Sequence, residues 1–177
     1  MEFQTESKPL NLMLRPVSIF DAASYILEKS PWTITQLELQ ELLYLSQMFH
    51  LGLHRTPLMS ARFEARKYGP VNKTLYDELI KYGTDALISS NIPGDYRAIV
   101  GETHKSVLDF VVDKLSDRVG AELFGLTHRD GGAWRNTFNP HYPNVHIPDR
   151  LIMEEFVQKI EHIRNNPEHY SEAALNK

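Results

Sequence analysis

The sequence predicts a mainly α protein, folded as a single compact multi-helix domain with at most a short β-hairpin or strand pair. Apolar residues recur at three- and four-residue intervals in several long segments, and capping residues or a Gly-Pro pair mark where these segments begin. Apolar and polar residues alternate, as they do in strands, only over short stretches. A chain of 177 residues is also long enough to bury one sizeable core.

The composition narrows the function classes. With 42% hydrophobic and 24% charged residues, the chain has the balance of a folded globular protein. A net charge of -4 makes nucleic acid an unexpected partner. The absence of cysteine excludes thiolate metal ligands and cysteine nucleophiles and fits a reducing cytoplasm. Neither a secretory signal nor a run of about 18 apolar residues occurs, so we expect a cytoplasmic protein without a membrane partner.

The first half of the chain contains two predicted helices behind a flexible N-terminal arm, residues 1–15. Ser18 can cap a helix that carries one apolar stripe and stops at Ser30-Pro31. The pair Thr33 and Gln36 has the spacing of a second cap, which opens a longer helix through about Gly52. Because that helix is apolar on more than one face, we expect it in the centre of the domain.

The segment 63–83 combines three signals. Apolar and polar residues alternate from Arg62 to Arg66, which predicts an extended segment. Gly69-Pro70 then marks a turn, and a helix with a buried face should begin just after it. Gly83 stands where a left-handed C-cap belongs. Gly69, Pro70 and Gly83 are therefore predicted to be structural corner residues.

The second half is predicted to be helix and loop. Residues 84–101 hold several turn residues and should be mostly loop, with a short strand at 98–100. Helical spacing resumes at 102–115, and Ser116 or Asp117 can cap one more helix. Glycine and proline residues then break regular structure before a last helix at 149–164. We expect the domain to end near residue 165 and residues 166–177 to form a frayed tail.

The residues predict no catalytic site, metal or cofactor. A serine elbow, a phosphate-binding loop, a dinucleotide fingerprint and a paired-carboxylate motif are all missing from the sequence. His50 and His54 have i, i+4 spacing, but Gly52 and Pro57 argue against an unbroken helix there. Two further sets of residues are candidate sites. The histidines His128, His141 and His146 could bind zinc, and Glu64 could act as a general base held between Arg62 and Arg66. Surface histidines and an exposed ion pair explain them better.

Several motifs follow one another in a recognisable order. They are Tyr25-Ile-Leu-Glu-Lys29, Leu39-Gln-Glu-Leu-Leu-Tyr44, Phe63-Glu-Ala65, Tyr68-Gly-Pro-Val71, Leu75-Tyr76 and Leu126-Thr-His128 with Trp134. In combination they resemble the Panacea antitoxin domain, a family that includes phage-associated GepA-like proteins and Soc-type antitoxins of bacteria. The resemblance runs from about residue 17 to about residue 139, so the helical domain of residues 16–165 would be Panacea-like.

The resemblance implies a cytoplasmic antitoxin of a bacterial or prophage toxin-antitoxin system, which neutralises a cognate protein toxin by direct binding and is not an enzyme. Trp, Tyr and Arg are over-represented at binding hot spots. The candidate partner-binding residues are Arg66, Lys67, Tyr68, Trp134 and Arg135. For Tyr68 and Trp134 a core role is the alternative.

Two other functions compete with this one. The chain could be an adaptor or interaction protein that delivers a client to a protease, or that serves a phage or secretion apparatus, with its two terminal segments as tags. A metal-dependent enzyme that uses His128, Glu64 or the histidine loop ranks third. Loss of client turnover with retained toxin binding, after deletion of residues 1–15, would favour the adaptor, and a stoichiometric zinc would favour the enzyme.

Overall fold

The computed structural model describes residues 15–95, 97–99, 101–118 and 120–165 of the 177-residue chain. The predicted tail and all of the predicted arm except Arg15 lie outside these residues. Within them the fold is mainly α, as predicted, and the elements in chain order are α1 (Ile19–Lys29), α2 (Gln36–His54), β1 (Glu64–Arg66), β2 (Gly69–Val71), α3 (Lys73–Leu79), η1 (Ile80–Tyr82), η2 (Ser89–Asn91), α4 (Glu102–Leu115), α5 (Gly120–Thr127), α6 (Ala133–Thr137), β3 (Val145–His146) and α7 (Asp149–Asn165).

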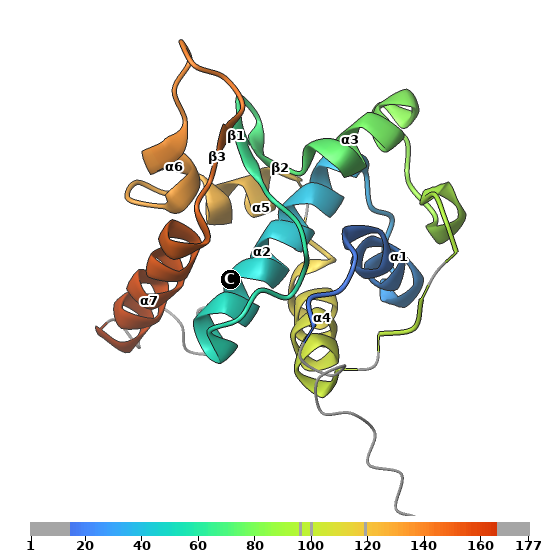
Figure 1. The fold of residues 1–177 in the computed structure, drawn as a ribbon, viewed down its shortest axis with the longest axis horizontal. Helices are drawn as coiled ribbons and strands as arrows, with labels where there is room; N and C mark the ends of the chain where they lie inside the picture. Colours follow the sequence, from blue (N-terminus) through green and yellow to red (C-terminus); the bar gives the residue numbers. More distant parts are fainter. Residues whose placement is uncertain (1–14, 96, 100, 119, 166–177) are drawn as a thin grey trace, which may run out of the picture.

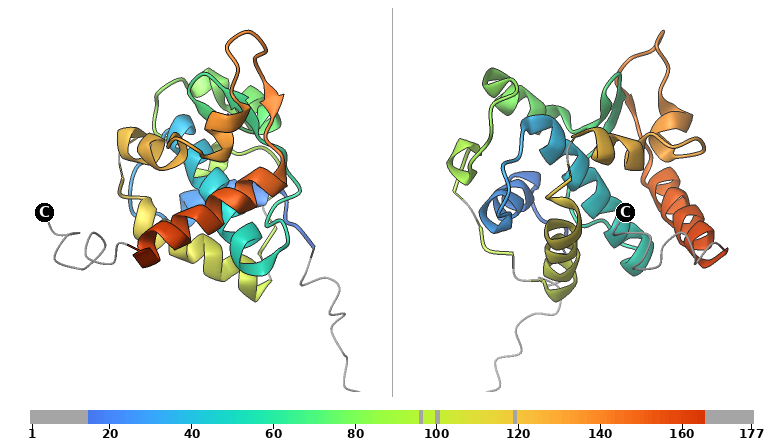
Figure 2. Two further views of the ribbon diagram at one scale, coloured as in Figure 1. Left: turned by 90° about the vertical axis from the view of Figure 1, so that its left-hand side faces the viewer. Right: turned by 180° about the vertical axis from the view of Figure 1, so that it is seen from behind.

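The helix α2 lies in the middle of the fold, as its all-round apolar pattern predicts (Figure 1). Helices α1 and α4 pack against it on one side, while α5 and α7 pack on the other. Figure 2 shows α7 lying across α2. The helix α2 contributes the following almost fully buried side chains to the core: Leu39, Leu42, Leu43, Tyr44, Leu45 and Met48. No helix of the described residues is long and apolar enough to cross a bilayer.

The ends of α2 differ from the prediction. The capping box is formed by Thr35 and Glu38, two residues after the predicted pair, because Ile34 is held extended by a backbone hydrogen bond from Leu87. At the other end α2 passes through Gly52 and continues to His54. A Cβ atom at Gly52 would lie 2.1 Å from the ring of Phe156, so this glycine serves helix packing and does not end the helix.

The other predicted helices are confirmed, but the predicted cap at Ser116 or Asp117 is wrong, because Ser116 is the C-cap of α4 and α5 begins only at Gly120. Ser18 caps α1, with its side chain accepting a hydrogen bond from the Phe20 amide, and α4 has the bounds that its spacing predicts. The strand predicted at 98–100 is wrong for Ala98 and Ile99, which have no strand partner, while Val100 lies outside the described residues. Ile99 is nevertheless buried, so its apolar character serves the core. The helix α6 was not predicted.

The sheet is small and antiparallel, with strand order β2-β1-β3. Strands β1 and β2 form the short hairpin that the sequence allows, and Ala65 lies opposite Pro70. The third strand, β3, was not predicted: it comes from the proline-rich loop and pairs Glu64 with His146. With only two residues it shows too little alternation to be recognised in a sequence.

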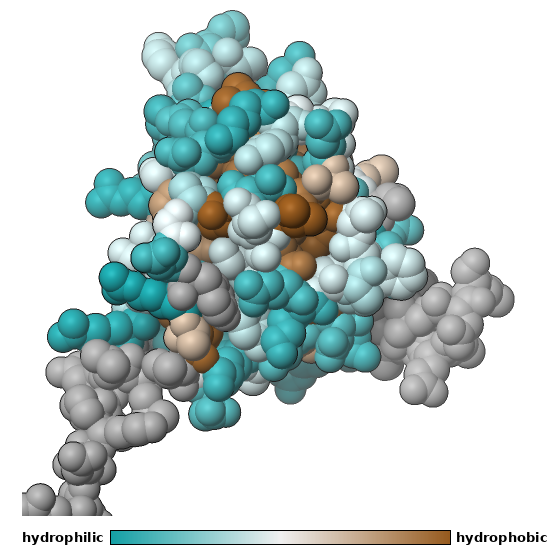
Figure 3. All heavy atoms as spheres, turned by 90° about the vertical axis from the view of Figure 1, so that its right-hand side faces the viewer, coloured by the Kyte–Doolittle hydropathy of each residue, from teal (hydrophilic) through white to brown (hydrophobic). Residues whose placement is uncertain are grey.

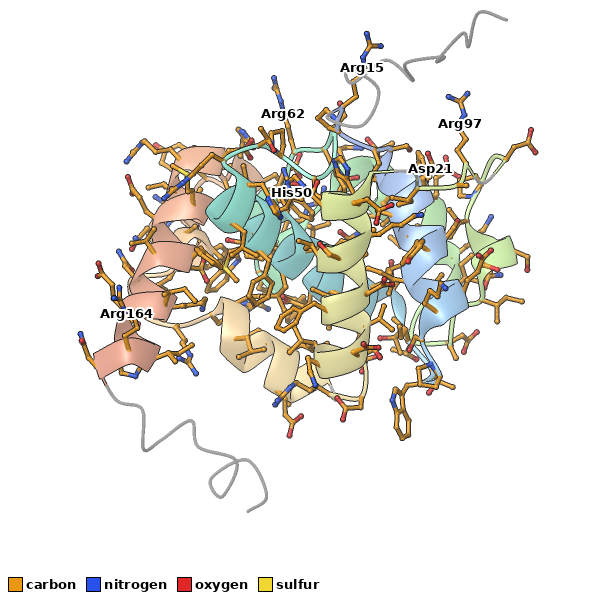
Figure 4. The ribbon with its side chains drawn as sticks, turned by 90° about the horizontal axis from the view of Figure 1, so that it is seen from below. Arg15, Asp21, His50, Arg62, Arg97 and Arg164 are labelled. Carbon is orange, nitrogen blue, oxygen red and sulfur yellow. The ribbon has the colours of Figure 1, made fainter. Side chains whose placement is uncertain are left out.

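Two buried histidines join α2 to α4. The rings of His50 and His104 stack with centroids 4.7 Å apart, and Figure 4 shows His50 between the two helices. The Nδ1–H of His50 donates to the carbonyl of Thr56 over 2.7 Å. Burial lowers the pKa of His50 to about 4 and also lowers the pKa of His104. Both imidazoles are therefore neutral in the folded chain at neutral pH.

We expect this pair to make the fold sensitive to acid. Between pH 6.5 and pH 4 the unfolded chain binds a proton that folded His50 does not bind, so the contribution of His50 to stability is complete above pH 6.5 and is lost as the pH falls to 4. For His50 alone the loss is about 3 kcal/mol. Urea unfolding of wild type and His50→Gln at pH 7.5 and pH 4.5 measures it. The variant should lose less stability between these pH values, whereas exposed His141→Gln should behave as wild type; equal slopes for all three would contradict the prediction.

Candidate functional site

The β1–β2 hairpin is built around Gly69. Lys67 and Tyr68 form its two-residue turn, and Gly69 follows with a φ of +124°, which L side chains rarely adopt. A Cβ atom at Gly69 would lie 2.3 Å from Oε1 of Glu41. Glycine is therefore needed here for two reasons, its backbone angle and the close approach to α2. The predicted positions of the turn are wrong by two residues, since the turn is formed by Lys67 and Tyr68 while Gly69 and Pro70 belong to β2.

Trp134 is hydrogen-bonded to the end of strand β1 and anchors this hairpin to α6. Its Nε1–H donates to the carbonyl of Arg66 over 2.9 Å, and its ring stacks on Phe138 with centroids 5.0 Å apart. Only 5% of the residue is exposed. The structure thus places Trp134 in the core, the alternative role considered for it, and not among the residues that a partner can reach.

Arg66, Lys67 and Tyr68 do reach the surface together. They line a groove of about 650 Å³ to which the hairpin, α3 and the first turn of α2 also contribute residues. We call this the hairpin groove. It is lined by Thr35, Gln36, Leu37, Gln40, Arg66, Lys67, Tyr68, Val71, Tyr76, Ile80, Gly83, Thr84, Pro143 and Asn144.

Exposed apolar side chains set the character of the hairpin groove. Tyr68 is 63% exposed, Ile80 51% and Leu37 43%. Leu37 and Ile80 were not predicted as site residues, because each belongs to an apolar pattern that elsewhere in the same segment faces the core. The one feature of the sequence that could have indicated their exposure is their position at the end of the apolar pattern of a helical segment.

The charges around the hairpin groove have one sign. None of the lining residues is acidic, although the chain carries a net charge of -4. Lys67 lies 5.1 Å from the ring centroid of Tyr68 and has no ion pair among the described residues. Arg66 is bound to Glu64 over 2.8 Å, and its guanidinium lies 4.9 Å from the ring centroid of Tyr76.

Of the remaining predicted residues, Arg135 lies apart from this groove and Gly83 lines it, as does Gln40, which was not predicted. Arg135, on α6, is exposed and 3.8 Å from Asp130, and it does not line the groove. Gly83 lines the groove and ends η1 with the positive φ that was predicted, +56°, but its ψ of -116° lies outside the left-handed helical region. Gln40 clamps the start of α3, since its Oε1 accepts from the Asn72 amide over 2.8 Å.

Beneath the hairpin lies a layer of buried polar side chains. The Glu155 carboxylate accepts hydrogen bonds from the Tyr44 hydroxyl and the Ala133 amide, both at 3.0 Å, and pairs with Lys159 at 3.0 Å. Burial raises the pKa of Glu41 to about 8; a hydrogen bond from Thr127 opposes this and the charge of Glu155 adds to it. These groups tie α2 to α7 and to the loop before α6.

His128 lies next to the same layer, close to Gly69. Burial lowers the pKa of His128 to about 4, and its Nδ1–H donates to the carbonyl of Phe124 over 2.9 Å. A Cβ atom at Gly69 would lie 3.1 Å from its Cε1 atom, so the hairpin closes over the ring. The described residues contain no cluster of three side chains suited to a metal ion, and His146 instead hydrogen-bonds the Phe63 carbonyl at 3.1 Å.

One family model matches the chain, over residues 39–135, and its description is "antitoxin SocA-like, Panacea domain". The match extends from α2 to α6 and includes the hairpin, Trp134 and most of the groove lining. Searches of curated proteins and of solved structures find no match.

Proposed function

Because the chain belongs to the family of SocA-like antitoxins with the Panacea domain, we propose that it is an antitoxin that neutralises a cognate protein toxin by binding it directly. The family match carries this proposal, since it covers more than half of the 177 residues. In this proposal the protein acts by binding and not by catalysis, in the cytoplasm, as part of a bacterial or prophage toxin-antitoxin system.

The surface chemistry supports a protein partner. Interfaces are rich in aromatic residues and arginine at their centres and polar at their rims. The hairpin groove offers Tyr68 and Tyr76 beside Arg66, with exposed aliphatic side chains next to them. The candidate bases have structural partners instead: Glu64 pairs with Arg66 and His128 with a backbone carbonyl.

Co-expression with the product of the neighbouring gene tests the proposal. We expect that product to arrest growth when expressed alone, growth to be restored when this chain is co-expressed, and the two proteins to purify together. A Trp134→Ala chain is the matched control, because loss of its packing should reduce both rescue and co-purification. A neighbouring product that is harmless alone and never co-purifies with the chain would refute the antitoxin function.

A further inference from the structure

We propose that the hairpin groove is the surface that binds the toxin, and that it receives a toxin segment in which a bulky apolar side chain lies next to a carboxylate. This inference rests on the proposed function and names the site and the chemistry of the partner. It starts from the three exposed apolar residues Leu37, Tyr68 and Ile80, which come from separate elements and meet at one groove.

The shape of the groove favours a protein over a small molecule. Small-molecule sites bury most of their ligand inside a concave pocket. Here three lining apolar side chains are exposed, and Tyr68 at the hairpin turn is exposed to 63%. Burying such a projecting aromatic residue requires a partner with a complementary surface of its own.

The charge of the groove selects an acidic segment. Two cations, Arg66 and Lys67, line it with no carboxylate among the lining residues, and Arg66 is already paired with Glu64. Of these two cations, Lys67 has no ion pair in the described part of the chain. Its ammonium group can therefore pair with a carboxylate of the partner without breaking an existing ion pair. Complementary charge of this kind speeds association and rejects wrong partners.

Side chains, rather than added strands, would make the contact. Strand β2 is an edge of the sheet, which could in principle pair with an extended peptide. Pro70 in the middle of β2 has no N–H to donate, and the strand has only three residues. The recognition we propose therefore depends on Tyr68, Ile80 and Lys67.

Other surfaces fit a toxin less well. A cavity of about 1,090 Å³ beside the start of α1 is lined by charges of both signs, including Arg62, Lys73, Glu64 and Asp149. Apolar side chains also gather in the middle of the face formed by α1 and α3, where hydrophilic side chains surround them (Figure 3). An apolar hollow of about 160 Å³ between α2 and α7 has Arg129 and Lys159 beside it, but Lys159 is already paired with Glu155.

The experiment measures binding of the purified neighbouring-gene product to wild type and to single variants. We expect Ile80→Asp and Lys67→Glu each to raise the Kd by about tenfold or more. The matched controls are Leu53→Asp, a 60% exposed apolar residue near the far end of α2, and Lys114→Glu on α4; both should change the Kd by less than about twofold. Because the four substituted residues lie at the surface, all variants should keep the wild-type circular dichroism spectrum.

The outcomes separate the inference from the proposed function. If wild type rescues growth and binds but the groove variants bind equally well, the toxin sits elsewhere and the inference fails while the antitoxin function stands. If wild type itself never binds, both fail. A wild-type dimer that Ile80→Asp splits into monomers would show that a second copy of the chain occupies the groove. Restoration of Lys67→Glu binding by a carboxylate-to-lysine change in the toxin would support the proposed charge pairing directly.

Discussion

Replacing Trp134 with alanine is expected to lower the free energy of unfolding by about 4 kcal/mol, since truncating a buried tryptophan leaves a large cavity. The substitution also removes the Nε1–H that donates to the Arg66 carbonyl, so the end of β1 loses its tie to α6. Urea unfolding followed by far-ultraviolet circular dichroism measures the loss without relying on tryptophan fluorescence. In this less stable variant we also expect the hairpin groove to lose its shape.

The other tryptophan provides the control. Trp32 is 59% exposed, and Trp32→Ala should change the stability by less than about 0.5 kcal/mol. Trp134→Phe keeps most of the ring packing and removes the donor, so it should cost less than the alanine variant, on the order of 1–2 kcal/mol. If Trp134→Ala were as stable as Trp32→Ala, the anchoring role assigned to Trp134 would be wrong.

The second large effect should come from Glu41→Gln at alkaline pH. Burial raises the pKa of Glu41 from 4.5 to about 8, so between these values the folded chain holds a proton that the unfolded chain has released. The contribution of Glu41 to stability is therefore fully present below pH 4.5, falls as the pH rises, and reaches its minimum above pH 8. The difference amounts to about 5 kcal/mol.

The glutamine variant has no such proton, so it should be more stable than wild type at pH 9 and similar to wild type at pH 4.5. Unfolding by urea at several pH values between 4.5 and 9 tests this, and the histidine contribution cancels because both chains share it. Exposed Glu122→Gln is the matched control and should keep the wild-type slope. A wild-type chain whose stability does not fall relative to Glu41→Gln over this range would contradict the burial of a protonated Glu41.

Local signals in the chain were enough for most of the helices. The spacing of apolar residues sets α1, α3, α4 and α7, because a helix of this kind needs one apolar stripe and a capping residue, and both are visible in the sequence. The start of α2 and the strand expected at Ala98 and Ile99 were predicted wrongly. At the start of α2 the contact of Ile34 with the distant Leu87 overrides the local pattern, and Ile99 is buried in the core without belonging to a strand.

The sequence by itself therefore determined a helical domain around one helix that is apolar on more than one face, its resemblance to an antitoxin family, and the presence of a turn close to Gly69. Only the tertiary structure decided which candidate residues are available to a partner. It buried Trp134 under the hairpin and brought Leu37 and Ile80 beside Tyr68. The physical reason is that an apolar residue at the end of a helix stripe looks the same in sequence whether a neighbouring element covers it or leaves it in water.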